Sequence, residues 1–324
     1  AASARRPAGA PLGGSMTFGA RLEAGVRARR SQLVLGLDPD PARLWPEALA
    51  GAPADGDPAE RTATAVVAHC AALIETAGPA CVAAKLQLAC FERLGPPGWR
   101  ALEDLVRLAR RTGLLTIADG KRGDVPVTAC AYGQALVGST SGPWGDIPGL
   151  GVDAFTASPL LGADALAPLV QAARQADAGI FVLVRTSNPG AADLQDLTVA
   201  GAPAGAAPVW EVVARLVDRL GQAGSRAELA DVGAVVGATA PDHLERMREL
   251  MPRAVFLLPG VGAQGGRVED LGPAFAPGPA GGLVAVSRAI ANAHEELGGE
   301  PRAAAAEAAR RLATETWERF GAGP

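Results

Sequence analysis

Short apolar runs recur about eight times along this sequence, each followed by turn residues and a longer stretch rich in Ala, Leu and Arg. The runs are nearly continuous in hydrophobicity and rich in Val, Ile and Leu, as parallel strands buried on both faces must be. They cover Leu33–Leu37, Cys81–Ala84, Leu114–Ala118, Val152–Ala157, Gly179–Val184, Val232–Val236, Val255–Leu258 and Leu283–Val286. Helical stretches between them include Glu60–Thr76, Gly98–Arg111, Ala163–Gln175, Pro208–Leu220 and Asp242–Leu250.

This alternation predicts an α/β fold, a (β/α)8 TIM barrel that forms a single domain over residues 16–324. The alternative, a doubly wound open sheet, usually has fewer strands, and no G-x-G-x-x-G follows the first run. Residues 1–15 offer almost nothing to bury, and we expect a disordered tail there. The stretches 138–151 and 188–205 exceed ordinary connections, and we expect functional or mobile loops at both.

Charge and cysteine content exclude several classes of function. The net charge is −4, from 30 Lys and Arg against 34 Asp and Glu, whereas a nucleic-acid-binding protein needs a basic surface. No segment approaches the roughly 18 consecutive apolar residues of a membrane span. The chain has four cysteines, Cys70, Cys81, Cys90 and Cys130. They lack C-x-x-C spacing, so we expect neither a disulfide framework nor a metal site. We expect a cytoplasmic location, because that compartment keeps thiols reduced.

Polar residues collect where the predicted strands end. Asp38 follows the first run, Lys85 follows the second, and the third leads into DGKRGD at 119–124. Later runs lead into RTSNPG at 185–190, PGVGAQGG at 259–266 and Ser287-Arg288. Because the active sites of TIM barrels lie at the carboxyl ends of the strands, this pattern predicts a single site at that end.

The end of the third strand carries alternating charges. Side chains alternate along a strand, so Asp119 and Lys121 project to the same side, where Lys85 of the adjacent strand reaches Asp119. Asp124, in the following turn, is able to approach Lys121, which gives an array of two ammonium and two carboxylate groups. A fixed ammonium can neutralise a developing carbanion and then protonate it, while a fixed carboxylate repels a substrate carboxylate. The alternative is a surface salt-bridge cluster, which the position of Lys85 disfavours.

The last two strand ends predict a phosphate site. The glycine-rich turn at 259–266 exposes backbone N–H groups, and loops after the seventh and eighth strands of barrels often bind phosphate. Arg288 adds a planar donor suited to bidentate phosphate contact. The alternative is a glycine-rich connection that only turns tightly.

With Lys85, DGKRGD, TSNPG and PGVGAQGG…SRAI in this order, the sequence resembles the orotidine 5′-monophosphate decarboxylase family, in its longer bacterial subgroup. The resemblance extends from about Phe18 to Ile290. It implies a (β/α)8 barrel, a homodimer and a carboxy-lyase that needs neither metal nor organic cofactor. The implied reaction converts orotidine 5′-monophosphate to uridine 5′-monophosphate (UMP) and CO₂, the last step of pyrimidine nucleotide synthesis.

The resemblance also implies a role for each matching residue. Lys121 would protonate C6 after CO₂ leaves, Asp119 would face the leaving carboxylate, and Lys85 would bridge Asp119 and the ribose. Asp124 would come from the neighbouring subunit together with Thr128, which would lie at the ribose and phosphate. The other implied contacts are Asp38 with the ribose, Ser187 with the pyrimidine, and Gln264, Arg288 and the backbone amides of Gly265 and Gly266 with the phosphate.

Two alternatives to this function stay open. Sister barrels that act on sugar phosphates share D-x-K-x-x-D but use Mg²⁺, held by an acidic residue after the second strand, where this sequence has Lys85-Leu86-Gln87. The second alternative is a catalytically inactive barrel that only binds a nucleotide. Evolutionary drift would have no reason to retain all four charged residues of the array, which are Lys85, Asp119, Lys121 and Asp124. The sequence departs from the subgroup at Ser158-Pro159-Leu160, where the subgroup has Asn-Pro-Tyr.

Overall fold

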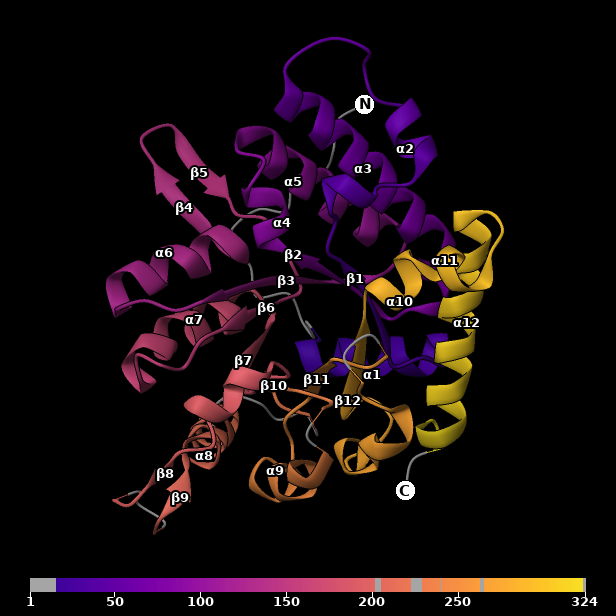
Figure 1. The fold of residues 1–324 in the computed structure, drawn as a ribbon. Helices are drawn as coiled ribbons and strands as arrows, with labels where there is room; N and C mark the ends of the chain where they lie inside the picture. Colours follow the sequence, from indigo (N-terminus) through magenta and orange to yellow (C-terminus); the bar gives the residue numbers. More distant parts are fainter. Residues whose placement is uncertain (1–15, 202–204, 223–228, 240, 263–264, 323–324) are drawn as a thin grey trace.

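The computed structural model of this chain describes residues 16–201, 205–222, 229–239, 241–262 and 265–322. Within them, eight parallel strands close into a barrel in the order β1-β12-β11-β10-β7-β6-β3-β2, with helices packed around it (Figure 1). The predicted (β/α)8 fold is therefore confirmed. The tail predicted at residues 1–15 lies outside the described residues.

Each barrel strand overlaps one of the predicted apolar runs. The largest difference is at the third, which continues through the polar residues to Arg122. The strands are β1 (Leu33–Leu37), β2 (Ala83–Gln87), β3 (Leu115–Arg122), β6 (Ala154–Ala157), β7 (Gly179–Arg185), β10 (Val232–Val236), β11 (Phe256–Pro259) and β12 (Gly282–Val286).

Longer helices cover the outside of the barrel. They are α3 (Pro58–Thr76), α5 (Pro96–Arg111), α6 (Pro126–Leu136), α7 (Ala163–Gln175), α8 (Val209–Gln222), α9 (Leu244–Leu250) and α12 (Pro301–Phe320). Short helices lie in the connections: α2 (Pro46–Ala50), α4 (Leu88–Glu92), α10 (Arg288–Ala291), α11 (Ala293–Leu297) and the 3-10 helices η1 (Pro41–Arg43), η2 (Gly78–Ala80), η3 (Pro189–Asp193), η4 (Pro241–His243) and η5 (Val268–Phe275). Local sequence sets the start of α3, because the side chain of Asp57 accepts the N–H groups of Ala59 and Glu60, and Pro58 is the first residue of the helix.

A short hairpin begins in each stretch predicted as a long loop, and the second hairpin ends beyond the predicted bound at residue 205. The first holds β4 (Ser139–Gly142) paired antiparallel with β5 (Gly145–Pro148), and both strands are largely exposed. The second holds η3, then β8 (Thr198–Val199) paired with β9 (Ala207–Pro208). Neither hairpin could be predicted, because neither carries the alternating apolar pattern that predicts a half-buried strand.

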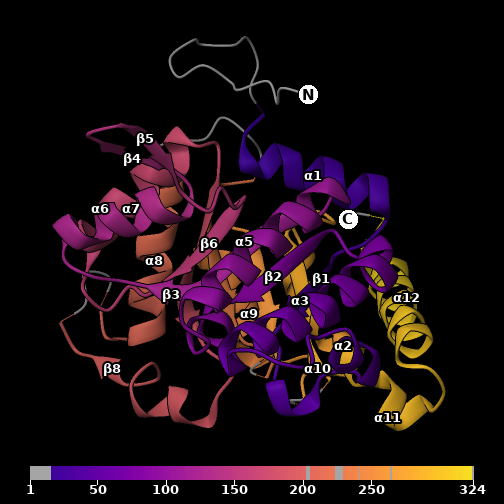
Figure 2. The same ribbon diagram turned by 90° about the horizontal axis from the view of Figure 1, so that it is seen from above.

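Helix α1 (Phe18–Arg29) covers one end of the barrel (Figure 2). Its residues Phe18, Leu22 and Val26 are buried in one apolar cluster with the side chains that fill the barrel interior. The ring of Phe18 packs edge-on against Phe181 of β7, with centroids 5.9 Å apart. Because this helix precedes β1 and closes the amino end of the strands, a site inside the barrel opens at the carboxyl end.

His69 of α3 makes stability depend on pH. Its side chain is buried, and its Nδ1 accepts the backbone N–H of Trp45 at 3.3 Å. Burial lowers the pKa of His69 to about 4, against the opposing charge of Glu47 and with the help of His294. Below the ordinary pKa of 6.5 the unfolded chain therefore binds a proton that the folded chain refuses until about pH 4.

We expect His69→Gln to flatten this dependence. Between pH 7 and pH 4.5, the free energy of unfolding of the unaltered chain should fall by about 2 kcal/mol more than that of the variant. Urea unfolding of both proteins at the two pH values measures the difference. A gap between the two proteins that does not change with pH would contradict the assignment.

Candidate active site

Four charged side chains meet at the carboxyl end of β1, β2 and β3. Lys85 donates from Nζ to Oδ2 of Asp119 at 2.7 Å, and Lys121 donates from Nζ to Oδ1 of the same carboxylate at 2.7 Å. Asp38 Oδ1 lies 3.7 Å from Lys85 Nζ. The side chains of Lys85 and Asp119 are each 8% exposed, whereas that of Lys121 is 44% exposed. We call these four residues the charged cluster; Lys121 is its most exposed cation.

The lysine content of the chain coincides with this cluster. Of the 30 Lys and Arg residues, two are lysines, and these are Lys85 and Lys121. The others are arginines, whose guanidinium stays protonated in proteins because its pKa lies above about 12. An ammonium gives up a proton far more readily. Both lysines of the chain lie in the charged cluster.

Mutual attraction keeps Asp119 and Lys85 ionised although both side chains are buried. Burial alone would raise the pKa of Asp119, but the charges and hydrogen bonds of Lys85 and Lys121 hold it well below its ordinary value. Burial alone would lower the pKa of Lys85, yet Asp38 and Asp119 raise it overall. The carboxylate of Asp119 and the ammonium of Lys85 therefore lie side by side as opposite charges at neutral pH, where burial leaves little water to screen them.

A bulge in β3 presents the charges to the barrel mouth. Residues 119–121 of β3 lie opposite the single Thr156 of β6, because the pairing of the two strands shifts there. Lys121 takes a left-handed backbone conformation, with φ at 48°, which is uncommon for a residue other than glycine. Such strain is frequent where a site needs one side chain held in one place.

Within the described residues, neither Asp124 nor Thr128 forms a hydrogen bond or ion pair with the charged cluster of its own chain. The carboxylate of Asp124 accepts the backbone N–H of Val125 at 2.7 Å. Among the described residues it forms no ion pair with Lys85 or Lys121, so the four-group array predicted from the sequence is not assembled by one chain in this way. Thr128 is half-buried in the first turn of α6.

A cavity of about 90 Å³ joins the charged cluster to the ends of β11 and β12. Asp38 and Lys85 line one part of it, and Gly260 and Arg288 line another. A larger cavity of about 430 Å³ adjoins it and is also lined by Asp38 and Arg288. Arg288 thus lines both cavities, whereas Lys85 lines the smaller one.

The glycine-rich turn after β11 is held by its own backbone. The N–H of Gly265 donates to the carbonyl of Gly262 at 2.8 Å, and the N–H of Gly266 donates to that of Gly260 at 3.0 Å. Gly262 and Gly265 both take positive φ values, 73° and 87°. Amide contacts to a phosphate would require this turn to rearrange. Gln264 lies outside the described residues.

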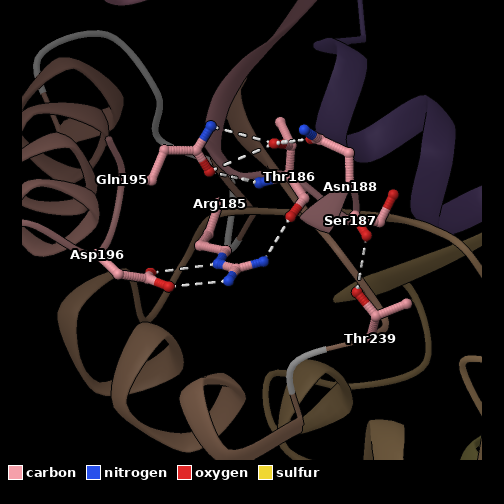
Figure 3. Close-up of polar contacts among 7 residues, drawn as sticks. All are labelled: Arg185, Thr186, Ser187, Asn188, Gln195, Asp196 and Thr239. Carbon is pink, nitrogen blue, oxygen red and sulfur yellow. Dashed lines mark hydrogen bonds and ion pairs between the residues drawn. The ribbon is translucent and has the colours of Figure 1, made fainter. Parts of the chain in front are cut away.

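Ser187 lies in a loop braced from two sides (Figure 3). Thr239 donates from its hydroxyl to the carbonyl of Ser187 at 3.2 Å. On the other side, Gln195 accepts the N–H of Thr186 at 2.8 Å and donates to the Thr186 hydroxyl at 3.1 Å. The hydroxyl of Ser187 takes no part in the contacts drawn.

An ion pair between Arg185 and Asp196 also stabilises this loop. Arg185, the last residue of β7, donates to both carboxylate oxygens of Asp196, at 2.9 and 3.3 Å, and to the carbonyl of Thr186 at 2.8 Å (Figure 3). Bidentate pairs of this kind fix orientation as well as distance. The segment after β7 therefore folds back on itself and holds Ser187 at the end of the strand.

Comparison with known proteins places this chain in a family. The model of the "Orotidine 5'-phosphate decarboxylase / HUMPS family" matches residues 31–308. The chain belongs to this family.

Several members of the orotidine 5′-phosphate decarboxylase family are similar over most of their length. A Rhodopirellula baltica protein with the name orotidine 5′-phosphate decarboxylase is 39% identical over 284 residues, which cover 86% of this chain and 90% of the relative. One from Deinococcus radiodurans is 44% identical over 67% of this chain and 74% of its own. The structure of Leishmania donovani OMP decarboxylase superposes with a TM-score of 0.68 at 31% identity, over 94% of this chain and 99% of that one.

Sequence reasoning missed three polar residues of this family member's site. Thr156 contacts both Asp119 and Lys121, Gln87 donates to Asp119 Oδ2 at 3.3 Å, and Gln195 braces the Ser187 loop. Thr156 had a signal, because it is one of two polar residues, with Asp153, in the predicted run Val152–Ala157. Gln87 follows Lys85 by two positions and so faces the same side of β2. Gln195 lies within a long loop, where spacing carries no such information.

Within the described ranges, no three His, Cys, Asp or Glu side chains are grouped so as to hold a metal ion. No helix there combines the length and the apolar character that crossing a membrane requires. The four cysteines are free thiols.

Proposed function

We propose that this chain decarboxylates orotidine 5′-monophosphate to UMP and CO₂, the last step of pyrimidine nucleotide synthesis, without metal or organic cofactor. The observation that carries the proposal is the carboxylate of Asp119, held at 2.7 Å by the ammonium groups of both Lys85 and Lys121. A cavity leads from Lys85 to Arg288, so charge stabilisation and phosphate binding share one barrel mouth.

The reaction needs charge stabilisation because of where its electrons go. When the bond from C6 to the carboxylate breaks, the electron pair stays on C6 in the plane of the ring, where no π system delocalises it. The ammonium of Lys121 stabilises this carbanion and then gives it a proton. A pair of unit charges 4 Å apart is worth roughly 4 kcal/mol at an effective dielectric constant of 20, and more where water is excluded. Preorganised charge of this kind is usually the largest catalytic contribution.

The other residues of the charged cluster position and strain the substrate. Asp119 lies against the leaving carboxylate and disfavours the ground state by repulsion. Lys85 holds Asp119 and reaches the ribose, which Asp38 also binds. Ser187 donates to the pyrimidine, and the brace around its loop fixes that contact.

Phosphate binding supplies the remaining energy from a distance. Arg288 and Gln264 bind the phosphate, with the amides of Gly265 and Gly266 recruited when the turn at 259–266 rearranges. The binding energy of contacts remote from C6 can offset the cost of closing the site and of imposing the strained geometry.

Arg288→Ala should therefore weaken substrate binding more than it slows chemistry. We expect KM for orotidine 5′-monophosphate to rise roughly 100-fold, since a charged hydrogen-bonded pair is worth about 1.5–3 kcal/mol. The affinity for uridine, which lacks the phosphate, should stay unchanged. Steady-state kinetics and uridine titration measure the two effects. Equal loss of uridine affinity would place Arg288 away from the phosphate.

A spectrophotometric assay with orotidine 5′-monophosphate in EDTA tests the proposed reaction. Turnover should be unchanged by the chelator, because both cations of the charged cluster are side chains. Turnover that depends on added Mg²⁺ would favour a sugar-phosphate sister barrel, and binding of UMP without turnover would favour an inactive nucleotide-binding barrel.

We further propose a homodimer in which Asp124 and Thr128 reach the charged cluster of the partner. Exposed apolar side chains follow Asp124 in the sequence, since Val125 is 55% exposed and Val127 is 85% exposed, and Leu160 after β6 is 77% exposed. Contiguous exposed apolar surface is typical of a protein interface. Asp124 pairs with neither lysine of its own chain among the described residues. We therefore propose that the carboxylate expected beside Lys121 comes from Asp124 of a second chain.

Mixing two inactive variants tests this arrangement. Lys121→Ala and Asp124→Ala homodimers should each be nearly inactive, but after subunit exchange half the dimers are mixed and contain one intact site of two. About a quarter of the full activity should return. No recovery in a mixture shown to contain mixed dimers would mean that Asp124 acts within its own chain.

We also propose a cytoplasmic location. The four cysteines are free thiols, and two of them, Cys90 and Cys130, are not buried. Unpaired accessible thiols are typical of a reducing compartment.

A further inference from the structure

We propose that Thr156 is a positioning residue of the charged cluster, whose single hydroxyl holds both the carboxylate of Asp119 and the left-handed backbone of Lys121. The inference rests on the proposed function and adds a residue to it. Thr156 lies on β6 and is 1% exposed. Its Oγ1 accepts the backbone N–H of Lys121 at 2.9 Å and donates to Oδ1 of Asp119 at 2.8 Å.

The first of these contacts replaces one that the bulge removes. Because three residues of β3 lie opposite Thr156 alone, the N–H of Lys121 has no place in the regular ladder between β3 and β6. A buried N–H without a partner is costly, and the Thr156 hydroxyl supplies the partner. It thereby stabilises a φ of 48° that Lys121 would otherwise leave.

The second contact fixes the rotation of the Asp119 carboxylate. Oδ1 accepts from both Thr156 and Lys121, while Oδ2 accepts from Lys85 and from Gln87. With the hydroxyl in place, each oxygen faces one lysine. Without it, the carboxylate can turn and take the ammonium of Lys121 away from the position of C6. A misplacement of about 1 Å is enough to slow an enzyme roughly 100-fold.

The chain contains a matched control on β3, near the end of that strand away from Asp119 and Lys121. Thr116 of β3 is also fully buried, and its hydroxyl accepts the N–H of Asp153 at 3.2 Å and donates to the carboxylate of Asp153 at 2.9 Å. That carboxylate pairs with Arg21 of α1, at the closed end of the barrel. Thr116 therefore makes the same two kinds of contact as Thr156 without touching the charged cluster.

Three variants separate positioning from general packing. Thr156→Val, which keeps the shape and removes the hydroxyl, should lower kcat about 10- to 100-fold while KM and UMP affinity stay within about threefold. Thr156→Ser restores the hydroxyl and should recover kcat to within about threefold. Thr116→Val should lower the melting temperature but leave kcat within about threefold of the unaltered chain.

A second readout does not depend on activity. Because the chain has two lysines, labelling lysine with ¹⁵N at the backbone gives two amide signals, those of Lys85 and Lys121. In Thr156→Val the Lys121 amide should shift and exchange its hydrogen at least about tenfold faster, whereas the Lys85 amide should not. Thr156→Ser and Thr116→Val should leave both signals near their original positions.

Several results would overturn the proposal. They are a kcat of Thr156→Val within threefold of the unaltered chain, a serine variant as slow as the valine variant, an equal loss of kcat in Thr116→Val, or an unchanged Lys121 amide. If the unaltered chain itself shows no turnover, the proposed function fails, and the catalytic role of Thr156 fails with it. Turnover by the unaltered chain together with any of the first four results overturns the role of Thr156 alone.

Discussion

Lys121→Ala is expected to lower kcat by roughly 10⁴-fold or more, because it removes both the charge that stabilises the carbanion and the proton that quenches it. UMP affinity should stay within a few-fold, since the product makes its main contacts with the ribose and phosphate groups of the site. Single-turnover decarboxylation and UMP titration measure the two quantities. The side chain is 44% exposed, so its removal should leave the fold intact.

Lys121→Arg is the informative control for this variant. It keeps a positive charge next to Asp119 but replaces the ammonium with a guanidinium that does not release its proton near neutral pH. We expect it to be nearly as inactive as the alanine variant. If Lys121→Arg recovers most of the activity, Lys121 supplies charge alone, and if Lys121→Ala keeps more than about 1% of kcat, it is not the proton donor.

Asp119→Asn is expected to lower kcat by roughly 10³-fold or more and also to destabilise the fold. Asparagine is neutral, so it neither repels the substrate carboxylate nor offsets the repulsion between the two ammonium groups that Asp119 bridges. Lys85, which is 8% exposed, would keep only Asp38 at 3.7 Å as a counter-charge. Removing one partner of a buried ion pair typically costs about 3–5 kcal/mol. Single-turnover kinetics and urea unfolding measure the two losses.

Asp153→Asn is the matched control for that loss of stability. Asp153 is a buried carboxylate on the chain segment that enters β6, and it pairs with Arg21 at the closed end of the barrel. Its replacement should also destabilise the fold but leave kcat almost unchanged. A similar loss of kcat in both variants would show that activity reports stability, and a kcat of Asp119→Asn within tenfold of the unaltered chain would remove Asp119 from the mechanism.

The barrel could be predicted because its strands are buried on both faces. Continuous runs such as Leu33–Leu37 and Val232–Val236 appear in the structure with the predicted bounds. The hairpin at 139–148 could not be predicted, because its strands are exposed and carry no apolar alternation. Stability of that hairpin comes from backbone pairing, which leaves no mark on composition.

The charged cluster could be predicted only in outline. Strand alternation places Asp119 and Lys121 on one side, and neighbouring strands bring Lys85 to them. The bulge and the left-handed backbone of Lys121 follow from how β3 pairs with β6, which no local pattern specifies. The contact proposed for Asp124 lies on a second chain, so the sequence predicts the chemistry of that contact but not its geometry.

Exchange of the C6 hydrogen of UMP with solvent deuterium tests the central claim most directly. By microscopic reversibility, a charged cluster that stabilises the C6 carbanion during decarboxylation must also form it from UMP, so the C6 proton signal should fade in D₂O. We predict catalysed exchange by the unaltered chain and a loss of roughly 10³-fold or more with Lys121→Ala. Exchange that is equally fast with Lys121→Ala, or decarboxylation without any exchange, would contradict the account.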